Sequence, residues 1–390
     1  MPQRRLLYMH NVDISTKSAN LVQVVSMCNA WSATGYRVLL TLRSSGMHHN
    51  QGKNYLQRNT GLSPEVQLHL MRSPLPGKIS RHLSPMFVRR VMNRYKPHLC
   101  FVRDPVYFNL ATKSGIPTVM ELHNNRMHHG IGWLNQRFSN MVKRGSRRES
   151  ALMLIAISHQ LGQWWEDAGI PGNKLLVLHD GFNPDMFINP QEKLAARQRL
   201  GLPSDRNIVV YTGNLQQNRG IHYILKLALM NPDLLFVLAG GKHADMERVQ
   251  QETGQQGIDN IRLLGHIPHP GIPDCLYAAD VLLAMWSAEV PTIAYCSPLK
   301  VFEYMASGRP AVYPAYPTIR EVVTDGLNGF LAPPDDPGGL HHALHRALGM
   351  SDDERALYEE SSRSVAFDHY SWHRRVSAIQ ERLPENLRTL

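Results

Sequence analysis

The chain has 390 residues, of which 43% are hydrophobic and 19% are charged, as in an ordinary globular protein. This length exceeds what a single hydrophobic core supports, so we expect two domains of roughly 180–200 residues. No run of about 18 apolar residues occurs, the four cysteines are widely spaced, and the N-terminus lacks a signal-peptide pattern. These features argue against a membrane-spanning or disulfide-stabilised protein and predict a cytoplasmic protein with reduced thiols.

The net charge of +10 is concentrated in the first part of the chain. Residues 1–150 hold 22 Lys and Arg residues against 5 Asp and Glu residues, a balance of +17, and many of the basic residues cluster in 78–94 and 137–148. Such clusters attract anionic surfaces, so they predict contact with membrane lipid or a pyrophosphate-bearing acceptor. A solvated basic face without a partner is the alternative. Nucleic acid is disfavoured because no motif that recognises it is visible.

Strand-like and helix-like segments alternate along the first 180 residues. Apolar residues have helical spacing in 18–34, and further helices are expected over 106–113 and 158–168. The apolar segments between them are the expected strands, over 5–9, 36–42, 99–102, 118–122, 153–157 and 174–178. This alternation predicts a parallel sheet with helices on both faces.

A second series of strands follows a polar segment that contains prolines and glutamines. These strands are expected over 207–211, 234–239, 261–264, 281–284, 311–313 and 329–331. The sequence therefore predicts an α/β protein with two Rossmann-like domains, 1–182 and 207–365, joined by a linker over 183–206. The last segment, 366–390, is expected to be helical, with Trp372 as an anchor, and to pack back toward the first domain. Two doubly wound domains joined in this way place one cleft between the carboxyl ends of both sheets.

The segment 297–310, SPLKVFEYMASGRP, has the pattern of a helix that meets a ligand at its N-terminus. Ser297 is the candidate N-cap, and a proline suits the first helical position. The amides of Leu299 and Lys300, together with the Lys300 ammonium, favour an anion, while Glu303 can accept hydrogen bonds from hydroxyls. A phosphate beside vicinal hydroxyls describes a nucleotide sugar. The plainer interpretation is an ordinary capped surface helix.

A second anion-binding turn is indicated by 212–220, which lies between a strand and a helix. Gly213 permits a tight turn, Asn214 follows it, and Arg219 at the helix entrance offers a forked cation to a phosphate. A single turn of this kind is a weak signal, since a surface arginine is common there. It gains weight beside Lys300 because both turns belong to one predicted sheet.

Other candidates follow strands or border the expected cleft. Gly241 lets a nucleotide approach bare backbone, and His266 marks a turn where a base could be held, although both positions also suit simple turns. His123 ends strand 118–122 and can hydrogen-bond a hydroxyl or phosphate, while Arg103 and Lys17 are candidates on the acceptor side. The alternatives are a structural histidine and an Arg103 salt bridge. The 20 histidines show no metal-ligand pattern, so we expect no metal site.

With these segments in place, the sequence resembles glycosyltransferase family 4, whose members are retaining transferases with the GT-B fold, two Rossmann-like domains facing across a cleft. The resemblance extends over nearly the whole chain. It is carried, in order, by 121–123, 156–158, 180–182, 212–220, 265–267, 278–283 and 297–310. The last of these segments is the most specific.

The resemblance implies a role for each matching position. Glu303 matches a glutamate that binds the donor ribose, Arg219 and Lys300 match diphosphate-binding residues, and His123 matches a histidine that contacts the donor sugar. The implied catalytic residues are His123, Lys300 and Arg219. Together with the positions singled out above from local pattern, the expected donor-binding residues are Gly213, Asn214, Arg219, Gly241, His266, Ser297, Leu299, Lys300 and Glu303.

Two positions depart from the family pattern. A first glutamate, seven residues apart from the second in many members, falls here at Tyr295, and Glu289 is the nearest carboxylate that could substitute. The arginine of the first phosphate turn is replaced by Asn214, which leaves the diphosphate to Arg219 and Lys300. Donor binding is therefore better supported than the chemistry at the sugar.

The resemblance implies retaining transfer of a hexosyl unit from a UDP- or GDP-sugar to an acceptor hydroxyl, without a metal cofactor. The acceptor is expected to be a lipid-linked or polysaccharide glycan, at the inner face of a membrane that the basic domain contacts. A sugar-nucleotide epimerase or hydrolase of the same fold is one alternative. The other is a degenerate nucleotide-binding scaffold, which Tyr295 and Asn214 favour.

Overall fold

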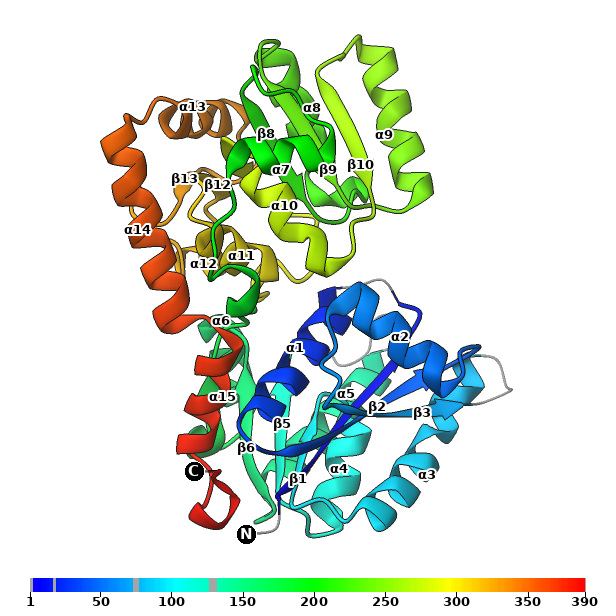
Figure 1. Ribbon diagram of the computed structural model, residues 1–390. Coiled ribbons are helices and arrows are strands. Elements are labelled where there is room, and N and C mark those ends of the chain that lie inside the picture. Colours follow the sequence, from blue (N-terminus) through cyan, green and yellow to red (C-terminus); the bar gives the residue numbers. More distant parts are fainter. Residues whose placement is uncertain (1–2, 17–18, 73–76, 126–131, 390) are drawn as a thin grey trace. The chain divides into compact units, whose positions relative to one another are not determined.

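The computed structural model describes residues 3–16, 19–72, 77–125 and 132–389. The chain forms two compact units, the first comprising Met1–Asp180 and Trp372–Leu390 and the second Gly181–Ser371 (Figure 1). Each unit contains one parallel β-sheet with helices packed against it. The predicted α/β architecture with two Rossmann-like sheets is confirmed.

The sheet of the first unit has seven strands in the order β3-β2-β1-β4-β5-β6-β7. Their bounds are β1 (Arg5–Asp13), β2 (Arg37–Ser44), β3 (Gln67–Arg72), β4 (Leu99–Val102), β5 (Thr118–Leu122), β6 (Ala151–Ala156) and β7 (Leu175–Val177). Strands β4 and β5 are buried throughout, as expected for central strands covered on both faces. Glu121 is a charged residue within the buried strand β5, and its carboxylate is completely buried.

The helices of the first unit include several that the sequence pattern does not predict. Their bounds are α1 (Ala19–Ala33), α2 (His49–Thr60), α3 (Gly77–Tyr95), α4 (Pro105–Lys113), α5 (Gly132–Ser146), α6 (His159–Asp167) and α15 (Trp372–Glu381). Asp104 caps α4 by accepting a hydrogen bond from the amide of Val106 at 2.8 Å. Strand β3 and helices α2, α3 and α5 are additions to the predicted element list.

The sheet of the second unit has six strands in the order β10-β9-β8-β11-β12-β13. Their bounds are β8 (Ile208–Thr212), β9 (Leu235–Ala239), β10 (Ile261–Gly265), β11 (Val281–Leu283), β12 (Ala311–Pro314) and β13 (Phe330–Ala332). The helices are α7 (Lys193–Leu200), α8 (Ile221–Met230), α9 (His243–Gln256), α10 (Ile272–Tyr277), α11 (Leu299–Ser307), α12 (Pro317–Arg320), α13 (Pro337–Leu348) and α14 (Asp352–His369). All strand pairings in both sheets are parallel, so the carboxyl ends of β8, β9 and β10 lie along one edge.

The segment expected to be a linker, 183–206, contains helix α7 and packs within the second unit. Arg197 of α7 is only 3% exposed and donates to the Asp280 carboxylate at 2.5 Å and to the Ala278 carbonyl at 2.9 Å. Pairing two buried charges in this way ties the helix to the start of β11. The segment is therefore a packed part of the second unit and not an extended connection, and its polar residues other than Arg197 are exposed or partly exposed.

The segment expected to be one C-terminal helix, 366–390, is divided between the two units. Helix α14 ends at His369, Ser371 forms an isolated bridge with Phe182, and α15 begins at Trp372. Within the first unit α15 packs against α1, where Gln380 donates to the Thr34 hydroxyl at 2.7 Å. The chain thus returns to the first unit after completing the second.

Candidate functional site

Lys300 is a desolvated cation near the carboxyl end of β8. It lies in the first turn of α11, with Nζ 4.1 Å from the centre of the Tyr211 ring and 5.2 Å from the Trp286 ring. Among the residues that the structure describes, no carboxylate forms an ion pair with it. Burial and then the nearby Arg219 charge lower the pKa of Lys300 from 10.5 to about 7, partly offset by Glu303. An anion placed here would restore the favourable environment that the ammonium lacks.

Arg219 supplies a second cation to the same region. It ends the 3-10 turn η3 (Gln217–Arg219) that precedes α8. Its Nε is buried and makes no hydrogen bond within the described part of the chain. Buried N–H groups are nearly always paired, so an unpaired one beside a desolvated lysine indicates a missing acceptor. A phosphate group would satisfy both side chains.

Two glycines let the backbone pass closely beside this cation pair. Gly213 (φ +146) and Gly240 (φ +126) adopt conformations that other residues rarely take. A Cβ at Gly240 would lie 2.0 Å from the Gly213 carbonyl oxygen, and a Cβ at Gly213 would lie 2.7 Å from Lys300 Nζ. The ends of β8 and β9 therefore need bare backbone at both positions for Lys300 to lie where it does.

Helix α11 begins one residue later than the sequence pattern predicts. Pro298 is the N-cap residue and Leu299 the first helical residue, so Ser297 is not the cap, and no side chain caps the helix. Ser297 is buried, with 7% of its surface exposed. The first-turn amides of Leu299 and Lys300 still lack partners within the helix, as at any helix N-terminus. Gly308 ends the helix in the left-handed conformation, as expected.

Glu303 is paired with a histidine that the sequence patterns do not single out. Its Oε1 lies 2.6 Å from His269 Nε2, and both side chains are nearly buried, 9% and 12% exposed. His269 begins the short turn η4 (His269–Gly271) after β10. One carboxylate oxygen is thus engaged by His269, which leaves the other to accept hydrogen bonds from a ligand. A histidine in a proline-rich turn carries no distinctive sequence signal.

The remaining candidates of the second unit occupy turns and core positions. Asn214 is exposed, and its side chain accepts a hydrogen bond from the Gln216 amide at 3.2 Å. His266 is exposed directly after β10. A Cβ at Gly241 would lie 2.8 Å from the Leu215 side chain, so its close approach is to Leu215. Tyr295, the expected departure from the family pattern, is a buried residue with 7% of its surface exposed.

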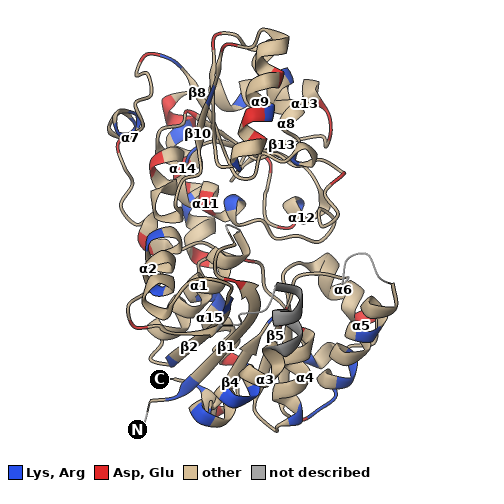
Figure 2. Cartoon of the chain, turned by 90° about the vertical axis from the view of Figure 1, so that its right-hand side faces the viewer, with Lys and Arg blue, Asp and Glu red and all other residues tan. Residues whose placement is uncertain are grey.

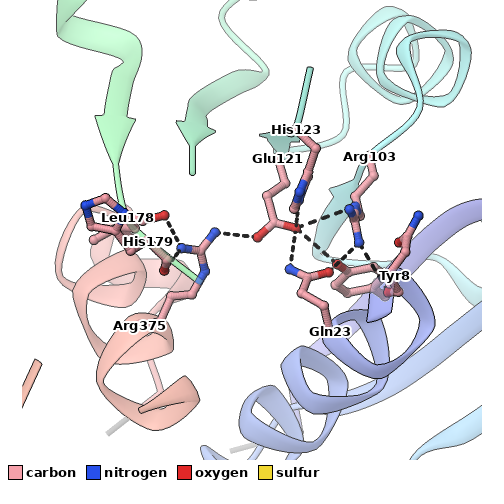
Figure 3. A network of polar contacts seen from close by, with 9 residues as sticks. Tyr8, Gln23, Arg103, Glu121, His123, Leu178, His179 and Arg375 are labelled. Carbon is pink, nitrogen blue, oxygen red and sulfur yellow. Dashed lines mark hydrogen bonds and ion pairs between the residues drawn. The ribbon is translucent and has the colours of Figure 1, made fainter. Parts of the chain in front are cut away.

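In the first unit, Glu121 is the centre of a buried polar network (Figure 3). Arg375 from α15 donates to its Oε1 at 2.5 Å. On the other oxygen, Oε2, Gln23 donates at 2.9 Å and His123 Nε2 lies 3.1 Å away, although the ring is not aligned for a full hydrogen bond. Arg103 Nε lies 3.8 Å from Oε2. The sequence placed Glu121, His123 and Arg103 at strand ends, but Arg375 and Gln23 were missed.

Burial and neighbouring charge determine the protonation of this network. Burial raises the pKa of Glu121, but Arg375, His123 and Arg103 together lower it well below its usual value. Burial and the Arg103 charge lower the pKa of His123 from 6.5 to about 4, against the opposing effect of Glu121. Burial also raises the pKa of Asp180 to about 7, an effect that Glu121 increases and Arg375 reduces. At neutral pH His123 is therefore an uncharged imidazole beside an ionised glutamate.

Arg103 and Lys17 are the two candidates on the acceptor side, and the structure describes Arg103. Arg103 is 6% exposed at its side chain and donates to the Gln23 side chain, so its guanidinium belongs to the Glu121 network. This agrees with the salt-bridge alternative for Arg103. Lys17 lies outside the described residues.

Three residues of the first unit offer ligand atoms close enough together for a metal ion. Glu121, His123 and Asp180 each offer one ligand atom, and these atoms lie within 4.8 Å of one another. Two guanidiniums already face Glu121, so a metal cation would meet strong repulsion there. Glu121 thus has two cationic partners within the first unit, and the cluster is a buried polar network.

Both halves of the chain match known glycosyltransferase families. Residues 22–186 match Glycosyltransferase Family 4, and residues 192–364 match Glycosyl transferases group 1. The lipopolysaccharide 1,2-N-acetylglucosaminetransferase of Salmonella typhimurium is 24% identical over 250 residues, covering 59% of this chain and 61% of that protein. The D-inositol 3-phosphate glycosyltransferase of Mycobacterium leprae is 27% identical over 211 residues, covering 53% and 48%. The chain thus matches less than two thirds of the length of either relative.

Solved structures resemble the chain over almost its full length. Anabaena HepE in complex with UDP and glucose has a TM-score of 0.75 at 18% identity, covering 98% of this chain and all of that one. WaaG, a glycosyltransferase involved in lipopolysaccharide biosynthesis, has a TM-score of 0.66 at 14% identity, covering 96% and 99%. These similarities confirm the GT-B fold, and the family matches confirm the expected relationship to glycosyltransferase enzymes.

Proposed function

Because the chain joins a domain of glycosyltransferase family 4 to a domain of glycosyl transferases group 1, we propose that it transfers a hexosyl unit from a nucleoside diphosphate sugar to an acceptor hydroxyl. The observation that carries the proposal is the pair of desolvated cations, Lys300 and Arg219, beside the bare backbone of Gly213. A diphosphate fits this site by charge and by hydrogen-bonding capacity. The complex of the structurally similar HepE with UDP and glucose supports a UDP-sugar as the first donor to test, with a GDP-sugar second.

In the proposed reaction the second unit stabilises the departing diphosphate. Negative charge develops on the leaving oxygen as the glycosidic bond breaks, and the Lys300 ammonium, the Arg219 guanidinium and the α11 dipole oppose it. These groups supply the charge stabilisation for which other transferases use a metal. Retention of the anomeric configuration follows from attack by the acceptor hydroxyl on the face from which the diphosphate leaves, with the phosphate oxygen receiving the hydroxyl proton.

The donor is identified by a thermal-shift screen of UDP, GDP, ADP and their sugars, since a ligand that binds only the folded protein raises its melting temperature. Turnover of the best donor is then measured with and without glycan acceptors, and the anomeric configuration of the product is determined by NMR. A new sugar linkage supports the proposal. Free diphosphate or an altered sugar without a new linkage indicates a hydrolase or epimerase, and binding without turnover indicates a scaffold.

Glu303 is proposed to bind the ribose hydroxyls through the oxygen that His269 leaves open. Replacing Glu303 by Ala is expected to weaken UDP binding by about 10–100-fold, since a hydrogen bond to a charged group contributes about 1.5–3 kcal/mol. Calorimetry with UDP and 2′-deoxy-UDP measures this. The wild type should prefer UDP, and Glu303→Ala should lose that preference.

His269→Gln serves as the companion variant for Glu303. It removes the partner that orients the carboxylate but keeps the carboxylate itself, so the loss in UDP affinity is expected to be smaller than for Glu303→Ala. Unchanged UDP affinity in Glu303→Ala would remove the ribose assignment.

The acceptor is proposed to be a lipid-linked or polysaccharide glycan presented at an anionic membrane surface on its cytoplasmic side. Lys and Arg residues are frequent on the described elements of the first unit, including α3 and α5 (Figure 2). Two large apolar side chains on these helices are also exposed, Met86 at 62% and Trp133 at 65%. Basic residues beside exposed aromatic and apolar ones suit a peripheral contact with anionic lipid. In the described part of the chain, no helix has the length and apolar character needed to cross a bilayer.

Charge reversal tests this membrane contact. The variant carries four Arg→Glu changes on exposed residues of the first unit, Arg89, Arg90, Arg144 and Arg147. It is expected to lose binding to anionic vesicles in a sedimentation assay, because each basic residue near the surface contributes about 1 kcal/mol. The control carries the same change at four exposed residues of the second unit, Lys226, Lys242, Arg262 and Arg320. Equal binding by both variants would contradict the proposed contact.

A further inference from the structure

Helix α15 brings Arg375 to the end of β5, although the two residues of the contact are 254 positions apart in the chain. The Arg375 side chain is 3% exposed. One of its terminal nitrogens donates to Glu121 Oε1 at 2.5 Å, and the other donates to the backbone carbonyls of Leu178 and His179 (Figure 3). Because the guanidinium donates to three acceptors, its position and orientation are fixed. The Glu121 carboxylate that it contacts is therefore held in place as well.

The second oxygen of this fixed carboxylate faces His123. Nε2 of His123 lies 3.1 Å from Glu121 Oε2, and 17% of the His123 side chain remains exposed. Although the ring is not aligned for a full hydrogen bond, an ionised carboxylate attracts an N–H and repels a ring lone pair, so this close contact favours the tautomer that carries its proton on Nε2. The other ring nitrogen, Nδ1, then has a lone pair.

We propose that Arg375 is a positioning residue: by holding Glu121 it orients the His123 imidazole so that Nε2 faces the carboxylate and Nδ1 accepts a hydrogen bond from a substrate hydroxyl. The substrate part rests on the proposed function, whereas the orientation rests on the contacts of the first unit alone. His123 thereby serves as a neutral hydrogen-bond acceptor and not as a cation for phosphate.

The charges around the pair agree with this role. His123 is faced by Glu121 and by the two cations Arg103 and Arg375, which both oppose its protonation. Glu121 is also faced by Tyr8, whose hydroxyl lies 3.5 Å from Oε2, and its charge acts on the buried Asp180. His10 and Cys28 are buried nearby and uncharged at neutral pH, since burial lowers the pKa of His10 and raises that of Cys28. Removing Arg375 would leave Arg103, 3.8 Å from Oε2, as the remaining guanidinium facing Glu121, so the negative charge beside His123 would be less compensated and the ring would take up a proton more readily.

The test is histidine NMR on the full-length protein, without substrate. The ring of His123 is assigned by its loss in His123→Gln, and its tautomer and titration are followed between pH 5 and 9 in wild type, Arg375→Met and Arg375→Gln. The wild type is expected to show one neutral tautomer and no titration above pH 5. The neutral variants are expected to show a titration midpoint above pH 5 and a mixture of tautomers. Arg374→Met, at the exposed neighbouring position, is the matched control and should behave as wild type.

Kinetics add a second measurement. In Arg375→Gln the acid limb of kcat/KM is expected to move up by more than one pH unit and kcat to fall about tenfold or more, with UDP affinity unchanged because Lys300 and Arg219 belong to the other unit. A folded Arg375→Gln or Arg375→Met with the wild-type tautomer and no titration above pH 5 would overturn the proposal.

If both neutral variants fail to fold, Arg375→Lys provides the test of the proposed positioning role. Its ammonium keeps the charge, so the His123 midpoint should stay below pH 5, but it cannot hold Glu121 and both carbonyls at once. A mixture of tautomers with unchanged UDP affinity is therefore expected, and a single wild-type tautomer would overturn the proposal. A protein that shows the expected NMR behaviour but no transfer would count against the proposed function alone.

Discussion

Replacing Lys300 by methionine is expected to lower kcat/KM for the donor by about 10²–10³-fold, the usual cost of removing one preorganised group that stabilises the leaving charge. Methionine keeps most of the volume of the side chain between the Tyr211 and Trp286 rings. In the free protein burial and the Arg219 charge disfavour the ammonium by more than Glu303 favours it, so losing its charge is expected to cost the fold little. The melting temperature should therefore stay constant or rise while activity is largely lost. This combination is typical of a residue that is kept for function at some cost in stability.

The depressed pKa of Lys300 adds a pH dependence whose sign can be worked out. With a pKa of about 7, the side chain is mostly charged at pH 6 and mostly neutral at pH 8. An anionic donor binds the charged form better, so UDP affinity should fall as pH rises through this range, with proton uptake on binding. Calorimetry in buffers of different ionisation enthalpy measures both effects.

An arginine in place of this lysine would remain charged at every pH, so Lys300→Arg is the matched control for the charge. It should retain much of the UDP affinity and lose the fall between pH 6 and 8, whereas Lys300→Met should lose both. A steep fall that persists in Lys300→Arg would assign the titration to another group. Equal UDP affinity in wild type and Lys300→Met would show that the cation pair does not hold the diphosphate.

The sequence predicted the parts of the fold that depend on local apolar pattern. Buried strands such as β4 and β5 are continuous apolar runs, and α1 has clear helical spacing, so these elements were expected near their observed positions. Helix α2 was missed because its sequence, HNQGKNYLQRNT, is almost entirely polar and gains its order from a capping box and a left-handed Gly61. Strand β3, QLHLMR, was also missed, because its alternating polar and apolar residues extend over only 6 positions.

The residues of the candidate site also differ in how well the sequence predicts them. Lys300, Glu303 and Arg219 stand at strand-to-helix turns, where local sequence and the general geometry of parallel sheets point to ligand contacts. His269 and Arg375 contact partners that are 34 and 254 positions away in the chain. The residues adjacent to them in sequence do not indicate these contacts. The sequence thus points to Glu121 and Glu303, whereas their partners Arg375 and His269 are identified only in the folded chain.

His123→Gln is expected to lower kcat by about 10²–10³-fold while changing UDP affinity by less than twofold. In the proposed mechanism UDP binds the cations of the second unit, whereas His123 belongs to the first unit and contacts a substrate hydroxyl through a neutral ring. Steady-state kinetics with the donor found by the screen, together with calorimetry for UDP, separates the two effects.

A second variant at this position distinguishes an acceptor from a cation. Glutamine keeps a carbonyl oxygen that can accept a hydrogen bond, whereas His123→Lys provides only donors and a charge. If His123 accepts a hydroxyl hydrogen bond, His123→Lys should be the less active of the two. With a pKa of about 4 for His123, the wild-type profile should also show no limb from this residue between pH 6 and 8. Greater activity in His123→Lys than in His123→Gln would mean that the ring acts as a cation, and the neutral pairing of His123 with Glu121 would then have to change when substrate binds.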